Sequence, residues 1–273
     1  MFAALSRGWS LTKTSFKVLS LDKEIIALPL LSAVAMIIAV VGLGAGAFGI
    51  SMFDGTGFLT YMSIFGIYVV VYAIAIFFNA AVIEMATIRY NGGNPTIKDG
   101  LRKSWSRIGR ILQWAVVAAT VGLIFRILRD QARDSFIARI LISFLEFGWN
   151  VATFFVVPIA IFQDVGPFDA IKGSMGAMKR TWGESLTGVA TTGIVFFALG
   201  LLGIIPLLIG FLSGSAIVFF TFITIAVLYW IVLAAVNSAV DGILVAALYK
   251  YSIEGTLPQA FRDAGVDASN LAW

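Results

Sequence analysis

The sequence predicts an all-α fold: a polytopic membrane helix bundle in which six transmembrane helices form three hairpins, accompanied by interfacial amphipathic helices. Composition is the first observation, because 60% of the 273 residues are hydrophobic and only 12% are charged, against roughly half and a quarter in soluble domains. A soluble protein of this length would need more charge to cover its outer surface. The other two observations are uncharged stretches of the length that a bilayer crossing requires, and the small residues and prolines that separate them.

Missing residue types and motifs exclude many functions. The chain has no cysteine and no histidine, which excludes disulfides, thiolate or imidazole metal ligands and catalysis by histidine. It contains no phosphate-binding G-x-x-x-x-G-K-[ST] loop and no paired acidic motif for Mg²⁺. We therefore predict a protein that is not an enzyme, with no catalytic residues, no metal and no cofactor. Its basic residues lie in short clusters between apolar runs, which indicates membrane topology and no nucleic-acid partner.

Residues 1–23 are predicted to form an N-terminal interfacial amphipathic segment. Arg7, Lys13 and Lys17 alternate with apolar residues and with Trp9, a pattern typical of a helix that lies in the membrane interface with its cations toward lipid headgroups. The segment lacks the sustained apolar core of a cleavable signal peptide, so we expect it to persist in the mature chain. A plain solvated tail is the alternative.

A six-span membrane domain is predicted over residues 24–251. No charge lies between Glu24 and Asp54, and the uncharged run over residues 185–240 is broken near its middle by proline, glycine and serine, as a hairpin turn would break it. The predicted spans cover about 24–50, 58–88, 110–128, 140–163, 185–209 and 216–248, and a cytoplasmic C-terminal tail follows over 252–273.

The third span is the least regular of the six. The uncharged stretch over residues 111–125 is short for a crossing unless the flanking arginines snorkel. Six spans also place residues 126–139, which are rich in arginine, on the outer side against the positive-inside rule. A re-entrant third segment would move them inside but would exchange the sides of everything that follows. We keep six spans with both termini cytoplasmic, and expect Arg126 and Arg129 to pair with Asp130 on a helical cap.

An internal repeat divides the chain into three parts, each an interfacial helix followed by a hairpin. The sequences L-S-R-G-W-S (5–10), L-R-K-S-W-S (101–106) and M-K-R-T-W-G (178–183) precede spans one, three and five. Tryptophan beside a cation suits the headgroup boundary, and a proline opens the helix that follows spans two, four and six. Membrane lipids are therefore the predicted partner. The predicted headgroup contacts are Arg7, Trp9, Lys13, Lys17, Arg102, Lys103, Trp105, Lys179, Arg180 and Trp182.

Polar residues inside the apolar runs form the candidate intramembrane site, because ionisable groups are costly in lipid and usually face the bundle interior. Asp241 is the strongest candidate and follows Asn237 by one helical turn. Three structural alternatives stay open: Glu84 reaches the interface, Glu146 pairs with an arginine of residues 126–139, or the polar groups join neighbouring helices. The candidate residues are Asp241, Asn237, Glu84, Asn79, Glu146 and Asn150.

A resemblance to a known family rests on the segments S-R-G-W-S-L-T-K-T-S-F-K-V-L, L-D-K-E-I-I-A-L-P-L-L-S and Y-N-G-G-N-P-T-I-K-D-G-L. The chain resembles an uncharacterised prokaryotic family of six-span integral membrane proteins, defined only as a domain of unknown function. The resemblance covers nearly the whole chain. It implies a location in a prokaryotic plasma (inner) membrane and transfers no active-site residue.

The leading functional hypothesis is a structural or scaffolding membrane protein that contacts lipid headgroups and self-associates as a homo-oligomer. It rests on the repeated interfacial elements and on the lack of a reaction centre in the sequence. A transporter or channel for a small solute or lipid, built on Asn237 and Asp241, is the alternative. A third hypothesis is an accessory subunit that binds partner membrane subunits in a larger complex.

Overall fold

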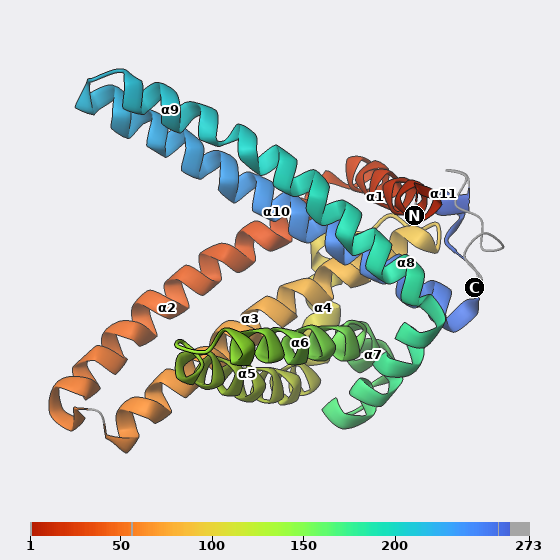
Figure 1. The fold of residues 1–273 in the computed structure, drawn as a ribbon. Coiled ribbons are helices and arrows are strands. Elements are labelled where there is room, and N and C mark those ends of the chain that lie inside the picture. Colours follow the sequence, from red (N-terminus) through yellow and green to blue (C-terminus); the bar gives the residue numbers. More distant parts are fainter. Residues whose placement is uncertain (1, 56, 256, 263–273) are drawn as a thin grey trace. The chain divides into compact units, whose positions relative to one another are not determined.

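The computed structural model describes residues 2–55, 57–255 and 257–262, and these residues form helices and no β-strand (Figure 1). The predicted all-α fold class is therefore confirmed. The helical elements are α1 (Phe2–Leu21), the 3₁₀ turn η1 (Lys23–Ile26), α2 (Ala27–Asp54), α3 (Phe58–Tyr90), α4 (Ile97–Ser106), α5 (Ile108–Gln131), α6 (Phe136–Thr153), α7 (Val156–Gln163), α8 (Pro167–Leu202), α9 (Ile204–Leu212), α10 (Ala216–Glu254) and α11 (Gln259–Arg262).

Among the described residues, six helical segments are long and apolar enough to cross a membrane. The third, α5, has 24 residues, which gives about 36 Å of helix, more than the roughly 30 Å of hydrocarbon in a bilayer. It has no internal break at which a re-entrant segment could turn back. The fourth is divided between α6 and α7. The six segments are Lys23–Phe53, Phe58–Tyr90, Ile108–Gln131, Phe136–Gln163, Ser185–Leu212 and Ala216–Glu254.

Local sequence explains where several helices begin and end. Pro167 is the first residue of α8 and Pro258 directly precedes α11, positions where the missing N–H of proline costs no helical hydrogen bond. The Ser135 Oγ atom caps α6 by accepting a hydrogen bond from the Ala138 N–H group at 3.2 Å. Gly255 ends α10 in the left-handed region at φ 69°, which glycine adopts without a Cβ penalty. The helix bounds are thus largely set by nearby residues.

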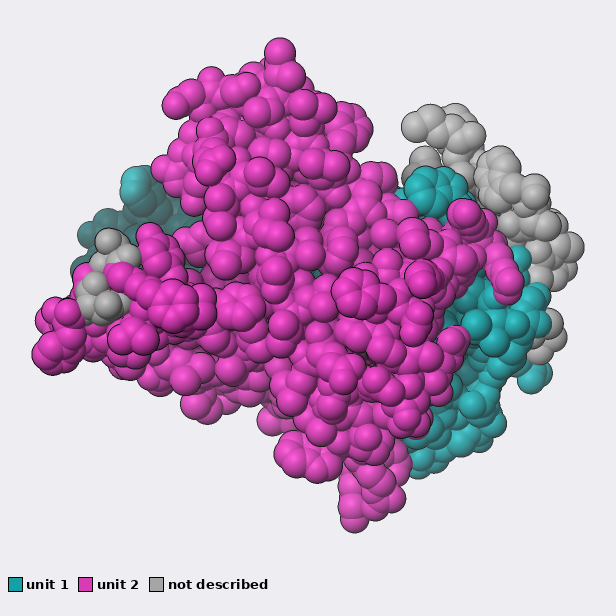
Figure 2. All heavy atoms as spheres, turned by 90° about the horizontal axis from the view of Figure 1, so that it is seen from below, with its two compact units in different colours: residues 1–30, 85–97, 181–273 teal, residues 31–84, 98–180 magenta. Residues whose placement is uncertain are grey.

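The chain forms two compact units (Figure 2). The backbone of Thr181, at φ −124° and ψ 19°, interrupts α8. The first part of α8 therefore belongs to unit 2 and the second part to unit 1. Unit 1 consists of Met1–Leu30, Met85–Ile97 and Thr181–Trp273, and unit 2 of Leu31–Glu84 and Lys98–Arg180.

Unit 1 is built around α1, which packs on α10 and on the second part of α8. Leu11 is fully buried. The Thr12 and Thr192 hydroxyl oxygens lie 2.9 Å apart in a hydrogen bond, and the rings of Phe16 and Phe196 stack with centroids 5.5 Å apart. The alternative of a solvated N-terminal tail is wrong for α1, because this helix supplies part of the core of unit 1.

Unit 2 contains α4, α5, α6 and α7, together with the first part of α8. The Ser104 hydroxyl of α4 donates a hydrogen bond to the Phe77 carbonyl oxygen of α3 at 2.8 Å. The Phe155 N–H group, between α6 and α7, donates to the Ser174 Oγ atom of α8 at 2.9 Å. Buried hydroxyl groups thus pair with backbone groups where these helices meet, as buried polar groups must.

Candidate functional site

Each copy of the repeated tryptophan motif combines a buried small residue with an exposed tryptophan. The residue before the tryptophan, Gly8, Ser104 or Thr181, is buried in all three copies. The exposed fractions are 53% for Trp9, 70% for Trp105 and 49% for Trp182. The sequence analysis identified the tryptophans and missed the small residue, although a small side chain at this position was visible in all three motifs.

The small residue makes the close contact. At Gly8, an added Cβ atom would lie 2.3 Å from the Thr191 Oγ1 atom and 2.6 Å from the Thr187 carbonyl oxygen. The Thr181 Oγ1 atom accepts a hydrogen bond from the Ser185 hydroxyl at 3.0 Å. The small residue therefore packs tightly against another helix in the first copy and accepts a hydrogen bond within its own helix in the third, while the neighbouring tryptophan is exposed in both.

The first copy of the motif departs from the other two. Helix α1 continues through Trp9 to Leu21, whereas α4 ends at Ser106, directly after Trp105. In α8 the break at Thr181 comes directly before the tryptophan. The motif thus accompanies a bend of the chain in the second and third copies, and lies within a continuous helix in the first.

Most of the predicted headgroup cations point away from the protein. Lys103 is different: its Nζ atom lies 5.0 Å from the centroid of the Phe162 ring, a cation–π contact that holds α4 against α7. Lys103 thus makes a packing contact inside the protein, and its headgroup contact stays a prediction. The Arg7 side chain and residues 263–273 of the predicted tail lie outside the described part of the chain. The exposed cations are Lys13, Lys17, Arg102, Lys179 and Arg180.

An ion pair connects two of the segments that carry the family resemblance. The Nε and Nη2 atoms of Arg89 donate hydrogen bonds to both carboxylate oxygens of Asp22, and Nη2 also donates to the Asn94 Oδ1 atom at 2.9 Å. The side chain of Asp22 is only 7% exposed and that of Arg89 is 25% exposed. Asp22 comes from L-D-K-E, and Arg89 directly precedes Y-N-G-G-N-P. These two segments therefore contact each other within unit 1.

The same turn also binds the C-terminal part of unit 1. The Tyr90 hydroxyl donates a hydrogen bond to the Ile243 carbonyl oxygen at 2.9 Å, and the Tyr90 ring meets the Phe261 ring edge-on with centroids 5.8 Å apart. The Lys250 ammonium donates to the Asn91 Oδ1 atom. Tyr90 and Asn91 thus bind the end of α3 to α10 and α11, contacts that the sequence did not predict.

The arginine-rich segment pairs differently from the expectation. The Arg129 Nη2 atom lies 3.1 Å from the Glu146 Oε1 atom, so the predicted pairing of Glu146 with an arginine of this segment is confirmed. Asp130 instead accepts a hydrogen bond from Arg133 at 2.8 Å. The predicted pairing of Arg126 and Arg129 with Asp130 is therefore wrong, because α3 and α6 bring other partners within reach of these arginines.

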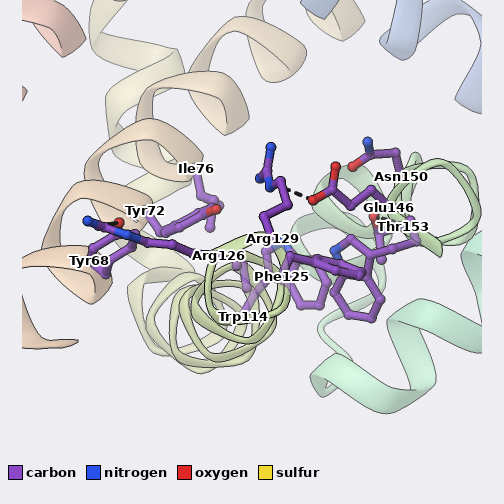
Figure 3. Close-up of a pocket in the computed structure, with 13 residues that line it drawn as sticks. Tyr68, Tyr72, Ile76, Trp114, Phe125, Arg126, Arg129, Glu146, Asn150 and Thr153 are labelled. Atoms are coloured by element: carbon purple, nitrogen blue, oxygen red, sulfur yellow. Dashed lines mark hydrogen bonds and ion pairs between the residues drawn. The ribbon is translucent and has the colours of Figure 1, made fainter. Parts of the chain in front are cut away.

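A cavity of about 620 Å³ lies between α3, α5 and α6 in unit 2 (Figure 3). Its volume falls in the range of small-molecule sites. Figure 3 shows Arg126 beside Tyr68 on one side and Arg129 reaching toward Glu146 on the other. Arg126 donates a hydrogen bond to the Tyr68 hydroxyl, and its guanidinium carbon lies 5.8 Å from the centroid of the Tyr68 ring. The cavity therefore carries charged groups from two helices.

Aromatic side chains and one glycine complete this cavity. The rings of Trp114 and Trp149 stack with centroids 5.9 Å apart at an interplanar angle of 21°. A Cβ atom at Gly122 would lie 2.7 Å from the Tyr72 hydroxyl oxygen, so the absence of a side chain there leaves room for the tyrosine. The wall is thus apolar and aromatic, with charged groups added to it.

The cavity gathers two of the six candidate intramembrane residues, Glu146 and Asn150. Asn79 and Glu84 belong to the same unit but do not line it. The other two candidates lie in α10 of unit 1, where the Asn237 Nδ2 group donates a hydrogen bond to the Asp241 Oδ2 atom at 3.1 Å. The Glu84 Oε2 atom is buried and has no hydrogen-bond partner in the described part of the chain.

A second charged cluster joins α5 to the turn between α7 and α8. The Asp164 carboxylate accepts a hydrogen bond from the Arg110 Nε atom at 3.0 Å and lies 2.5 Å from the Arg107 Nη1 atom. Its backbone adopts a left-handed conformation at φ 56°, which aspartate tolerates better than most residues. The hydrogen bond from Arg110 and the charge of Arg107 lower the pKa of the Asp164 carboxyl below its ordinary value of 3.8.

Replacing Arg110 with glutamine is expected to raise the pKa of Asp164 back toward 3.8, because the carboxylate loses its main hydrogen-bond donor. The pKa is depressed in the folded protein, so the pairing contributes stability above pH 3.8 and loses it as pH falls through the lower folded-state value. A ¹³C NMR titration of the Asp164 carboxyl measures the shift. R133Q is the matched control, and an equal shift in that variant would contradict the assignment.

These features define the class of protein. The chain is a helical, multi-pass membrane protein with three exposed motif tryptophans, a partly buried arginine–aspartate pair and a charged aromatic cavity. The chain belongs to the family of unknown function DUF6159, which matches residues 58–258. No curated protein and no solved structure gives a match.

Proposed function

We propose that the protein is a non-enzymatic structural or scaffolding component of a prokaryotic plasma membrane. Its interfacial helices would hold it against lipid headgroups, and its outer surface would support self-association or contact with partner membrane subunits. The observation that carries the proposal is the combination of a buried small residue and an exposed tryptophan in all three copies of the motif. Tryptophan is favoured at the headgroup boundary because its ring is apolar while its N–H group can still meet water or lipid oxygens.

Chain connectivity supports one common side for these elements. Helix α1, helix α4 and the first part of α8 precede the first, third and fifth membrane segments. An even number of crossings separates them, so six crossings return each to the same side. Exposed cations accompany all three, and the positive-inside rule assigns that side to the cytoplasm.

Transport through an intramembrane acidic site has weaker support. Of the polar candidates, only Glu146 and Asn150 line the cavity. Asp241 already accepts a hydrogen bond from Asn237 on its own helix, an arrangement that satisfies a buried carboxylate without a transported solute. Scaffolding is therefore the function that these residues support best.

Spin labels test the proposal directly, because the natural chain has no cysteine. We expect the exposed sites K13C, R102C and K179C to report headgroup depth in lipid nanodiscs by oxygen and nickel-chelate accessibility. The control I38C, at a 67% exposed position within the first membrane segment, should report acyl-chain depth. Membrane-impermeant maleimide should label the three headgroup sites from one side only.

A chain-depth signal at any of the three sites, or labelling of one of them from the opposite side, would contradict the proposal. Self-association is measured separately by the mass of the protein in nanodiscs. Because α1 is part of the core of unit 1, surface substitutions are preferable to its deletion. W105A with W182A should weaken assembly if the exposed indoles contribute to it, and unchanged assembly would remove them from the interface.

A further inference from the structure

The cavity between α3, α5 and α6 carries one more positive than negative charge. Arg126 and Arg129 line it, and Glu146 is the acidic residue among its lining groups. Glu146 pairs with Arg129, and Asp130, next along α5, is paired with Arg133. Arg126 contacts the neutral Tyr68 and forms no ion pair with a described residue. Asp130 also acts electrostatically on Arg126 but is itself paired with Arg133. A guanidinium group in a membrane segment is costly unless its charge is balanced, so the cavity is suited to a single negative charge.

The charge lies near one end of a membrane segment. Arg126 is five residues before the end of α5 at Gln131, about 7.5 Å along the helix axis. Trp114 is twelve residues before Arg126, about 18 Å deeper along the same axis. The cavity thus runs from a cationic end near one end of this membrane segment toward the stacked indoles of Trp114 and Trp149.

One oxygen at the charged end is available as an acceptor. The Glu146 Oε1 atom is buried, faces Arg129 at 3.1 Å, and has no hydrogen bond with suitable geometry among the described residues. A buried carboxylate oxygen without such a bond is unfavourable, and a ligand hydroxyl group would satisfy it. A choline headgroup has no hydroxyl to offer.

We propose that this cavity binds an anionic phospholipid whose phosphodiester carries a hydroxyl-bearing headgroup, as in phosphatidylglycerol. The phosphate, with its single negative charge, accepts hydrogen bonds from Arg126 and Arg129, because the guanidinium fork matches phosphate oxygens. A headgroup hydroxyl donates to the Glu146 Oε1 atom. The acyl chain extends along the aromatic wall toward Trp114. This inference rests on the cavity alone and is independent of the scaffolding function.

Native mass spectrometry of the full chain in detergent measures the binding. Phosphatidylglycerol and phosphatidylcholine with identical acyl chains are titrated separately, and the Kd of each first bound lipid is determined. We expect phosphatidylglycerol to bind roughly ten times more tightly, because its headgroup hydroxyl adds a charge-assisted hydrogen bond to the Glu146 carboxylate. R126Q should weaken phosphatidylglycerol binding by roughly tenfold, and it should also weaken phosphatidylcholine binding, because both lipids carry the phosphate that Arg126 contacts.

The matched control is R133Q, which removes an arginine from the same segment but outside the cavity. It should leave both Kd values unchanged. G122L is the second variant, because it keeps both arginines and fills the cavity beside Tyr72; it should abolish the preference for phosphatidylglycerol. Thermal unfolding identifies any variant that fails to fold. If R126Q does not fold, the G122L result tests the proposal, and if G122L does not fold, the R126Q result tests it.

Four outcomes would overturn the proposal. Equal Kd values for the two lipids would remove the charge selectivity, and an R133Q effect equal to that of R126Q would place the site outside the cavity. Displacement of bound lipid by inorganic phosphate at matched concentration would show that phosphate is recognised without the acyl chain. Preferential binding of a fatty acid would show that the cavity recognises a carboxylate and not a phosphodiester.

Discussion

Replacing Gly8 with alanine is expected to destabilise the protein by about 3 kcal/mol, at the upper end of the usual cost of overpacking. The added Cβ atom would lie 2.6 Å from the Thr187 carbonyl oxygen, and a backbone atom cannot move away as a flexible side chain can. Helix α1 must therefore shift away from the second part of α8. Unfolding by SDS in mixed micelles measures the loss, and faster amide hydrogen exchange in α1 locates it.

Gly44 provides the control. A Cβ atom there meets nothing within 4 Å, so G44A should be neutral or stabilising by about 0.5–1 kcal/mol through helix propensity. T191A combined with G8A should recover only part of the loss, since it removes the Thr191 hydroxyl but not the Thr187 carbonyl. A G8A cost no larger than that of G44A would show that α1 does not pack on α8 as described.

Replacing Arg89 with glutamine is expected to cost about 2 kcal/mol, between the values for exposed and for fully buried ion pairs. The change leaves Asp22, whose side chain is 7% exposed, without its guanidinium partner, and it also removes the hydrogen bond to Asn94. R89K should recover part of the loss, because lysine keeps the charge but cannot donate to both carboxylate oxygens at once. The same SDS unfolding experiment gives the values.

A double-mutant cycle with D22N tests the pair itself. The coupling free energy between R89Q and D22N should be about 1–3 kcal/mol, as for residues in direct contact. The exposed Arg102 serves as the reference arginine, and R102Q should change stability by less than about 0.5 kcal/mol. A coupling free energy near zero would mean that Arg89 and Asp22 do not stabilise the protein through their mutual contact.

The contacts of Gly8, Asp22 and Arg89 give a structural role to the segments on which the family resemblance rests. Gly8 comes from S-R-G-W-S, Asp22 comes from L-D-K-E, and Arg89 directly precedes Y-N-G-G-N-P. Their side chains, or the lack of one, serve contacts inside unit 1. Packing and ion pairing thus account for these three residues, of which Arg89 lies within the family match over residues 58–258.

Helical class and the number of membrane segments follow from the sequence alone. The length of an apolar run is a local property, and the rise of a helix converts it directly into a distance across the bilayer. Pro167 indicated the start of a helix, because proline lacks an N–H group and the first turn of a helix needs none. The pairing of Glu146 with an arginine was also within reach, because α6 returns beside α5 after a short turn.

Only the tertiary structure decided which distant residues meet. Sixty-seven residues separate Arg89 from Asp22, and Arg126 reaches Tyr68 on α3 although Asp130 lies one turn away on its own helix. Helical spacing ranks neighbours along one helix, whereas the partner of a side chain is set by which helix packs against it. The cavity, the contact at Gly8 and the contact of Lys103 with Phe162 share this cause, since each needs the positions of two or three helices at once.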